Sequence, residues 1–301
     1  MEIHNSPLIS VIVPCFNSGR TIKRTILSIK KQTWAKKEII LVNDGSTDGL
    51  TINALKELGD EKIVKLINQE NNGLASARNK GVYQSSGIFL FFLDADDWIE
   101  PQTLEMMYIH LMKNKKYGYI FPDIVLEGKR KGIIEKEFNL FEQFFLNQLP
   151  YCIFISKENF TKYGIYDENM KLGYEDWDLN IKLGTNKIFG KRLPLPLFHY
   201  DVQNTGMLLS KSIKNHIKIW KSIKIKNSSV YKISYLFSEW KLWRKKPSSY
   251  PLFIFFIWYL ILNIMPDNFS LKIFLSLRTM NMFLKRIIFK KKLKTNIKTY
   301  E

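Results

Sequence analysis

Three carboxylates gather within four positions of the chain, at Asp94, Asp96 and Asp97, directly after an apolar run. Mutual repulsion makes such a cluster costly unless a cation offsets it. Carboxylate oxygens suit hard cations such as Mg²⁺ or Mn²⁺, and these cations bridge to diphosphates. Because ligands of open α/β sheets bind just beyond the carboxyl ends of the strands, the stretch predicts a metal and phosphate site. The alternative is a solvated acidic turn that caps a helix starting near Pro101.

A second acidic pair, Glu175 and Asp176, follows Gly173 at the start of a predicted helix. Acidic residues at such a junction suit the positive end of the helix dipole, which is the simplest interpretation. The functional interpretation is a second carboxylate site that faces the first across a cleft.

Two further polar residues each allow two interpretations. Asp44 ends an apolar strand inside a turn, where it can accept hydrogen bonds from a nucleotide or only shape the turn and cap the next helix. Arg78 can pair with a diphosphate or lie on a solvated helix face. The sequence has no Walker-type glycine-rich loop and no GxGxxG, so phosphate binding would depend on the metal and on Arg78.

The elements that must position these residues alternate between strands and helices. Apolar runs predict strands at 8–13, 38–42, 63–68 and 88–93. Helices are predicted at about 21–31, from after residue 48 to about 58, and at 73–84. This alternation predicts a parallel sheet whose right-handed crossovers bring the strand ends to one edge. After Pro101, short segments around a turn at 128–132 indicate a hairpin, and further strands are predicted at 151–156 and 197–200.

The composition is that of a globular protein, with 46% hydrophobic residues. The two cysteines, Cys15 and Cys152, lie in predicted strands and are expected to be buried free thiols. Free thiols fit a reducing compartment, and the N-terminus has no basic and apolar leader, so we expect a cytoplasmic protein.

The charge is concentrated in the last third of the chain. Residues 211–301 hold 20 lysines and arginines against 3 acidic residues, whereas residues 1–210 hold 26 against 25. The apolar run from Leu252 to Ile264 is shorter than the ~20 residues that a spanning helix needs, and a basic and apolar segment follows at 271–289. This pattern predicts peripheral contact with an anionic membrane surface, at the inner face of the plasma membrane. The alternative is a helical subdomain that packs on the front domain or on another subunit of a homo-oligomer.

Five motifs follow one another in a fixed order: PCFN, NDGSTD, NNGLASARNKG, FLDADDW and GYEDWDL. In this order they resemble glycosyltransferase family 2, over about residues 8–205. The resemblance implies an α/β GT-A fold at 1–210, a Rossmann-like mixed sheet that binds a nucleotide sugar, followed by a helical basic region at 211–301. It also implies inverting transfer from a nucleoside-diphosphate sugar, usually UDP-linked, with Mn²⁺ or Mg²⁺.

The same resemblance implies roles for single residues. Asp176 matches the catalytic base, and the neighbouring Glu175 and Trp177 are expected either to contact the acceptor or to support the base. Asp44 matches the carboxylate at the uracil, and Asp94 and Asp96 match the pair at the ribose and the metal-diphosphate. The full set matched to donor binding is Pro14, Phe16, Asn17, Asp44, Arg78, Asp94, Ala95 and Asp96.

One histidine and one loop complete the comparison with the family pattern. His199 matches a residue that some members use as an additional metal ligand beside Asp94 and Asp96, and it can equally be structural. Many members place a basic residue on the diphosphate from the following loop. Here the loop at 201–208 has none, and the next basic residue is Lys211.

These expectations combine into a metal-dependent, inverting, hexosyltransferase-like enzyme that acts on a glycan or lipid-linked acceptor in cell-surface polysaccharide synthesis. A non-catalytic sugar-nucleotide binder is disfavoured because all the expected carboxylates are present. A nucleic-acid partner is not expected, because the aromatic residues of the tail cluster with aliphatic ones instead of forming a basic stacking surface. The sequence names neither the sugar nor the acceptor.

Overall fold

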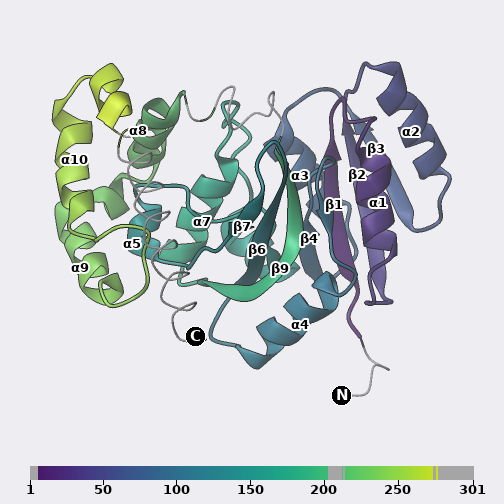
Figure 1. Cartoon of the computed structure of the whole chain (residues 1–301), viewed down its shortest axis with the longest axis horizontal. Coiled ribbons are helices and arrows are strands. Elements are labelled where there is room, and N and C mark those ends of the chain that lie inside the picture. Colours follow the sequence, from purple (N-terminus) through teal and green to yellow (C-terminus); the bar gives the residue numbers. More distant parts are fainter. Residues whose placement is uncertain (1–5, 203–211, 213, 274–275, 277–301) are drawn as a thin grey trace, which may run out of the picture.

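The computed structural model describes residues 6–202, 212, 214–273 and 276. One mixed sheet runs through the molecule, and Figure 1 shows β1, β2 and β3 at one end and α8, α9 and α10 together at the other. The strand order is β3-β2-β1-β4-β8-β6-β9-β5, and β7 pairs with β6 outside this path.

The first four strands form the parallel part of the sheet, in which β1 pairs with both β2 and β4, and β2 pairs with β3. The elements are β1 (Ile9–Cys15), α1 (Ile22–Lys30), β2 (Lys37–Asp44), α2 (Gly49–Gly59), β3 (Val64–Gln69), α3 (Leu74–Tyr83) and β4 (Phe89–Phe92). The predicted alternation of strands and helices is confirmed, with small shifts at the element ends.

The strands of this part are covered on both faces. Val11 belongs to a core cluster that includes α1, α2 and α4 (Thr103–Lys113), whereas the next residue, Ile12, belongs to the cluster that includes α3. Because successive side chains of a strand point to opposite faces, near-continuous apolar runs are what such a sheet requires. Cys15 and Cys152 are buried free thiols, as expected.

The rest of the sheet is mixed. The expected hairpin is confirmed as β6 (Tyr119–Gly128) and β7 (Gly132–Ile134), although the segments at 119–121 and 124–127 form one strand and not two. The short β8 (Phe154–Ser156) runs antiparallel to β4 and β6, whereas β9 (Gly190–Val202) runs parallel to β6 and is longer than the predicted strand at 197–200. The two-residue β5 (Trp98–Ile99) was not predicted, because such a short strand has no periodicity to detect.

The remaining helices follow β7 in the chain. They are α5 (Leu140–Gln143), α6 (Lys157–Asn159), the π-turn η2 (Phe160–Gly164), α7 (Glu175–Thr185), α8 (His216–Lys226), the 3₁₀ turn η4 (Ser228–Tyr231), α9 (Ile233–Trp243) and α10 (Ile254–Ile264). Trp220 of α8, Leu236 of α9 and Phe255 of α10 lie in the same hydrophobic cluster as Phe141 and Trp177. The helices after residue 211 therefore share a core with the sheet.

Two expectations for the tail meet the limits of the described residues. Within those residues, none of the helices is both long enough and apolar enough to cross a bilayer. The basic segment predicted at 271–289 lies largely outside them, as does the proposed boundary near residue 210.

Candidate active site

Two acidic segments from distant parts of the chain meet beyond the parallel strands. The first begins at Asp94, where the buried strand β4 has ended. The second is the first turn of α7, which the chain enters through two residues with positive φ, Gly173 (90°) and Tyr174 (64°). A left-handed backbone costs a non-glycine residue roughly 1–2 kcal/mol, so packing must hold Tyr174 there. Its ring lies edge-on to Trp177, and it is buried in the same cluster.

Arg78 of α3 joins the two segments. Its guanidinium donates from Nη2 to Asp94 at 2.7 Å and from Nη1 to Glu175 at 2.5 Å, and the side chain is only 1% exposed. The rings of Tyr151 and Tyr166 lie 4.8 and 5.3 Å from the guanidinium carbon. Arg78 therefore sets the spacing of the two acidic sites, and its predicted contact with a diphosphate stays a prediction.

Negative charge accumulates in the turn at 94–97. Burial and the neighbouring charge of Asp94 raise the pKa of Asp96 to about 6, and Asp201 adds to this effect. Asp97 is fully buried, and burial together with the charges of Asp96 and Asp94 raises the pKa of its carboxyl well above the usual range. A bound cation would relieve this repulsion.

The turn is held by hydrogen bonds from two other segments. The Tyr151 hydroxyl donates to Oδ2 of Asp97 at 2.5 Å and accepts from the backbone N–H of Asp94 at 2.9 Å. Oδ1 of Asp97 accepts from the backbone N–H of Asp201, at the end of β9, at 3.0 Å. Asp97 thus fixes the turn to its surroundings, which leaves Asp94 and Asp96 as the partly exposed carboxylates.

The candidate base, Asp176, lies in the first turn of α7. Both of its carboxylate oxygens accept from Nδ2 of Asn147, at 3.0 and 3.1 Å. Burial raises the pKa of Asp176 to about 7, and the negative charge of Glu175 adds to this, while Asn147 and Arg78 act in the opposite direction. A carboxylate that titrates near neutral pH is suited to take a proton from a hydroxyl group.

Trp177, predicted either to contact the acceptor or to support the base, is fully buried. Its Nε1 donates to the backbone carbonyl of Gln143 at 2.5 Å, and its ring stacks on His216 with 5.2 Å between centroids. Trp177 therefore supports the start of α7 and presents no surface to an acceptor.

Asp44, predicted at the nucleotide base, is buried at the end of β2. Its carboxylate accepts from the side chain of Gln69 at 2.8 Å and from the backbone N–H groups of Asn72 and Gly73 at 2.8 and 2.9 Å. These bonds show that Asp44 organises the turn before α3. Its contact with a nucleotide stays a prediction.

The loop after β1 contains two further predicted donor-side residues, Phe16 and Asn17. Asn17 adopts a φ of 50°, and its side-chain oxygen accepts from the backbone N–H of Thr47 at 2.9 Å, which joins this loop to the loop after β2. Phe16 and Asn17 are exposed, whereas Pro14 and Ala95 are buried. A nucleotide could therefore reach the side chains of Phe16 and Asn17.

His199 lies opposite Trp98 in the pairing of β5 with β9, and the two rings stack with 3.5 Å between centroids. Its Nδ1 lies 2.9 Å from a carboxylate oxygen of Glu127, and its Nε2 lies 2.9 Å from one of Glu100. Both ring nitrogens are thus engaged by glutamates. The predicted role of His199 as a metal ligand stays a prediction, and it requires one of these contacts to open.

The carboxylates of the turn at 94–97 are the donor groups that a metal ion could use. The described part of the chain contains no group of three or more His, Cys, Asp and Glu side chains arranged to hold a metal ion. Mg²⁺, however, is usually bound through one or two carboxylates, several waters and the phosphates of the substrate. The surplus negative charge around Asp96 fits a cation of that kind, whose coordination a diphosphate would complete.

Three residues at the site were not predicted from the sequence: Arg24, Asn147 and Tyr151. Exposed Arg24 of α1 donates to the backbone carbonyl of Asp96 at 2.6 Å and pairs with Asp201 at 3.2 Å. The sequence around these three residues contains no motif that marks them. Only the fold brings them beside the acidic segments.

Comparisons with known proteins find a family and several relatives that are similar to this chain. The model of the family described as Glycosyl transferase family 2 matches residues 10–166. The putative glycosyltransferase EpsH of Bacillus subtilis is 40% identical over 102 residues, which cover 34% of this chain and 30% of EpsH. The Escherichia coli protein WfgD, a UDP-Glc:alpha-D-GlcNAc-diphosphoundecaprenol beta-1,3-glucosyltransferase, is 40% identical over 108 residues, covering 36% of this chain and 42% of WfgD. The chain thus matches less than half the length of either relative.

Solved structures of S. aureus TarS share the architecture. Residues 1–349 of TarS in complex with UDP align with a TM-score of 0.55 and 20% identity, over 72% of this chain and 64% of that chain. The complex of the same protein with UDP-GlcNAc aligns with a TM-score of 0.57 and 18% identity, over 80% and 75%. At this identity the likeness concerns the fold, and the expected GT-A mixed sheet is confirmed.

Proposed function

The chain belongs to glycosyltransferase family 2, and from this premise we propose that it moves a sugar from a nucleoside-diphosphate donor to a hydroxyl of a glycan or lipid-linked acceptor, with inversion at the anomeric carbon. The main support is the pairing of Arg78 with both Asp94 and Glu175. Arg78 holds two sites beside each other. One is the acidic turn that is suited to a donor, and the other is the start of α7, which contains the proposed base.

In the proposed reaction, Asp176 accepts the proton of the acceptor hydroxyl. The hydroxyl oxygen forms a bond to the anomeric carbon as the bond from that carbon to the diphosphate breaks on the opposite face. This single displacement inverts the anomeric centre and needs no covalent nucleophile on the protein. The raised pKa of Asp176, about 7, makes it a stronger base than an ordinary carboxylate and leaves about half of it ionised at neutral pH.

Asp94 and Asp96 are the residues proposed to hold Mg²⁺ or Mn²⁺ together with the donor. When bound, the cation supplies positive charge against the negative charge that develops on the diphosphate. Asp94 already shares an oxygen with Arg78, so we assign the larger part of metal binding to Asp96. Phe16, Asn17 and Asp44 are proposed to line the nucleotide side.

The relatives support a particular donor and acceptor class. WfgD is described as using UDP-Glc and a diphosphoundecaprenol-linked acceptor, and the TarS complexes contain UDP or UDP-GlcNAc. On this basis we propose a UDP-sugar as donor and a lipid-linked or polymeric glycan of the cell surface as acceptor.

A screen of UDP- and GDP-sugars for thermal stabilisation, with and without Mn²⁺, tests the donor assignment. A ligand at 100 times its Kd stabilises the folded state by about 2.7 kcal/mol, which is readily seen as a higher Tm. We expect UDP-sugars to stabilise the protein only when the metal is present. Stabilisation by no nucleotide sugar, with or without metal, would contradict the proposal.

We further propose that α9 and α10 rest on an anionic membrane surface. The outer side of α10 exposes Ile257, Leu260 and Ile264, which lie on one helix face opposite the buried Phe255 and Trp258. Exposed basic residues lie in the last turn of α9 and directly after it: Lys241, Arg244, Lys245 and Lys246. Each Lys or Arg near an anionic leaflet adds about 1 kcal/mol, reduced by salt, and the apolar side chains add burial. Together with the expected reducing compartment, this favours the inner face of the plasma membrane.

Flotation with liposomes of rising anionic-lipid content tests the membrane proposal. Because α8 to α10 share a core with the sheet, point variants are more informative than a truncation. Ile257→Asp with Leu260→Asp should abolish binding, and Lys245→Gln with Lys246→Gln should make it weaker. Ile133→Asp, at an equally exposed apolar residue on β7, is the matched control. Equal flotation of all variants, or none of the wild type, would leave this surface as a contact for a second copy of the chain.

A further inference from the structure

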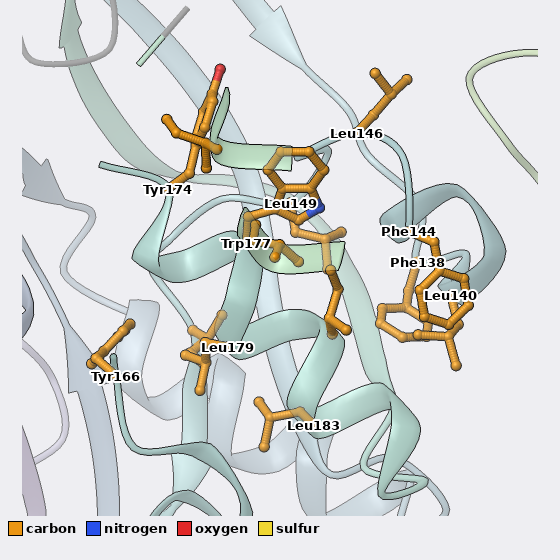
Figure 2. Packing of buried hydrophobic residues seen from close by; sticks show 14 of the residues in the cluster. Phe138, Leu140, Phe144, Leu146, Leu149, Tyr166, Tyr174, Trp177, Leu179 and Leu183 are labelled. Carbon is orange, nitrogen blue, oxygen red and sulfur yellow. The ribbon is translucent and has the colours of Figure 1, made fainter. Parts of the chain in front are cut away.

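The segment at 138–149, between β7 and β8, lies between the start of α7 and the C-terminal helices. Figure 2 shows the side chains of this segment and of α7 in one buried cluster, among them Phe138, Leu140, Phe144, Leu149, Trp177, Leu179 and Leu183. The sequence marks the segment only as an apolar connection. Its polar contacts, however, lead to the base on one side and to α8–α10 on the other.

On the side of the base, three hydrogen bonds join the segment to α7. Nδ2 of Asn147 donates to both carboxylate oxygens of Asp176, at 3.0 and 3.1 Å. The backbone carbonyl of Gln143 accepts from Nε1 of Trp177, the next residue after Asp176, at 2.5 Å. An amide can face a carboxylate stably only with its N–H group, so the contact also fixes the orientation of Asn147.

On the other side, the C-terminal helices hold the same segment. The backbone carbonyl of Phe144 accepts from Nε1 of Trp220 at 2.8 Å and from the hydroxyl of Tyr231 at 2.9 Å. The carboxylate of Glu142 accepts from the backbone N–H of Ser249 at 2.9 Å.

Ring contacts and a second amide complete this attachment. The ring of Phe145 stacks on Phe255 of α10 with 5.2 Å between centroids. Nδ2 of Asn139 donates to the backbone carbonyls of Trp243 and Pro247, at 3.3 and 3.2 Å. The segment is thus bonded to the C-terminal helices along most of its length.

We infer that Asn147 is a positioning residue for the catalytic base, and that the C-terminal helices hold it in place through the 138–149 segment. The inference rests on the proposed role of Asp176. Donation by Asn147 to both oxygens favours the ionised carboxylate and restricts its rotation. The helical region after residue 211 then serves the chemistry as well as any surface it contacts.

A direct measurement of Asp176 tests this inference without requiring turnover. Protein labelled with ¹³C at the aspartate carboxyls is titrated by NMR, and Asp176→Asn assigns the signal. The charged groups that face Asp176 are Glu175 on α7 and Arg78 on α3, and both stay unchanged in the variants below. Tyr166 and Tyr200, which sense its charge, also stay unchanged.

Asn147→Ala should move the titration midpoint of Asp176 to higher pH and lower kcat at neutral pH about tenfold, with the donor KM unchanged, because a hydrogen bond to the charged form is lost. Thr185→Val, at the far end of α7, removes a hydroxyl that donates only to the backbone carbonyls of Ile181 and Lys182 in the same helix, and it should leave the midpoint unchanged. Tyr231→Phe, which removes one bond to Phe144, should move it in the same direction by less.

An unchanged midpoint in Asn147→Ala would overturn the inference, whether or not transfer is detected. An unchanged midpoint in Tyr231→Phe would overturn the part that concerns the C-terminal helices. If the midpoint moves as expected but no nucleotide sugar supports transfer, the proposed function fails and the positioning of Asp176 by Asn147 is confirmed.

Discussion

The two acidic sites of this protein contain the same kind of residue and share Arg78, yet their surroundings differ. In the turn at 94–97, Asp96 lies among other carboxylates, and their charges raise its pKa in addition to burial. At the start of α7, burial is the main cause of the raised pKa of Asp176. Its neighbour Glu175 is paired with Arg78, and Asp176 accepts hydrogen bonds from Asn147.

The difference shows how neighbours assign roles to identical side chains. Several carboxylates together repel one another, so the turn gains most from a cation. The carboxylate of Asp176, which is desolvated by burial and hydrogen-bonded to Asn147, has a pKa of about 7, so it is suited to accept a proton. Mutations at the two sites should therefore have different effects on turnover, metal dependence and pH dependence.

The largest effect should come from the base. Asp176→Asn keeps the shape of the side chain but cannot accept a proton, so turnover should fall by about 10²–10⁴-fold with little change in donor affinity. Steady-state transfer from a labelled donor measures this. Asp167→Asn, which removes a carboxylate outside both acidic sites, should keep most of the activity. Unaltered turnover in Asp176→Asn would move the base elsewhere, with Glu175 the first candidate.

Loss of the shared arginine should be next. Arg78→Gln leaves two carboxylates without their buried partner, which should lower the free energy of unfolding by about 3–5 kcal/mol. Arg24→Gln breaks a partly exposed pair with Asp201 and should cost about 1 kcal/mol or less. Urea denaturation measures both. Losses of equal size would show that Arg78 does not join the two sites energetically.

Removal of the metal should affect the turn at 94–97 and leave the base untouched. Excess chelator should raise the activation free energy of transfer by about 3 kcal/mol, which lowers the rate roughly 10²-fold. Adding Mn²⁺ or Mg²⁺ should restore the rate. Asp96→Asn should raise the metal concentration required for half-maximal activity, whereas Asn147→Ala should not. Full activity in excess chelator would refute the assignment of Asp94 and Asp96.

The smallest effect should be a shift in pH dependence. The pKa of Asp176 is raised to about 7, and the base must be ionised, so kcat/KM should fall towards low pH with a midpoint near that value. Glu175→Gln removes a negative charge that raises the pKa of Asp176. It also removes an ion-pair partner of Arg78, whose positive charge lowers the same pKa. Both changes should move the acidic limb of the profile to lower pH. An acidic limb that stays in place would show that Asp176 is not the group that titrates.

The parallel part of the sheet was predictable because its signals are local. Apolar runs bounded by turns predict β1 to β4, and each acidic or polar motif follows a strand or precedes a helix by a few residues. The short β5 and the continuous β6 were missed because pairing with distant strands, and not local periodicity, determines them. The tail was ambiguous for a related reason. One side of α10 packs on the core and the other is exposed, and an almost wholly apolar helix shows no sequence difference between its two sides.

The sequence alone determined which residues this protein has available for chemistry: the carboxylates of two motifs, their order along the chain, and the strands and helices that hold them. Only the tertiary structure decided which of these residues meet. Arg78 and Glu175 are 97 residues apart in the chain, and Asn147 reaches Asp176 from a connection without a motif. Local patterns report the period and the ends of elements, whereas distances between elements depend on topology and on the packing of the whole core. For that reason the partners that tune each carboxylate had to be found in the fold.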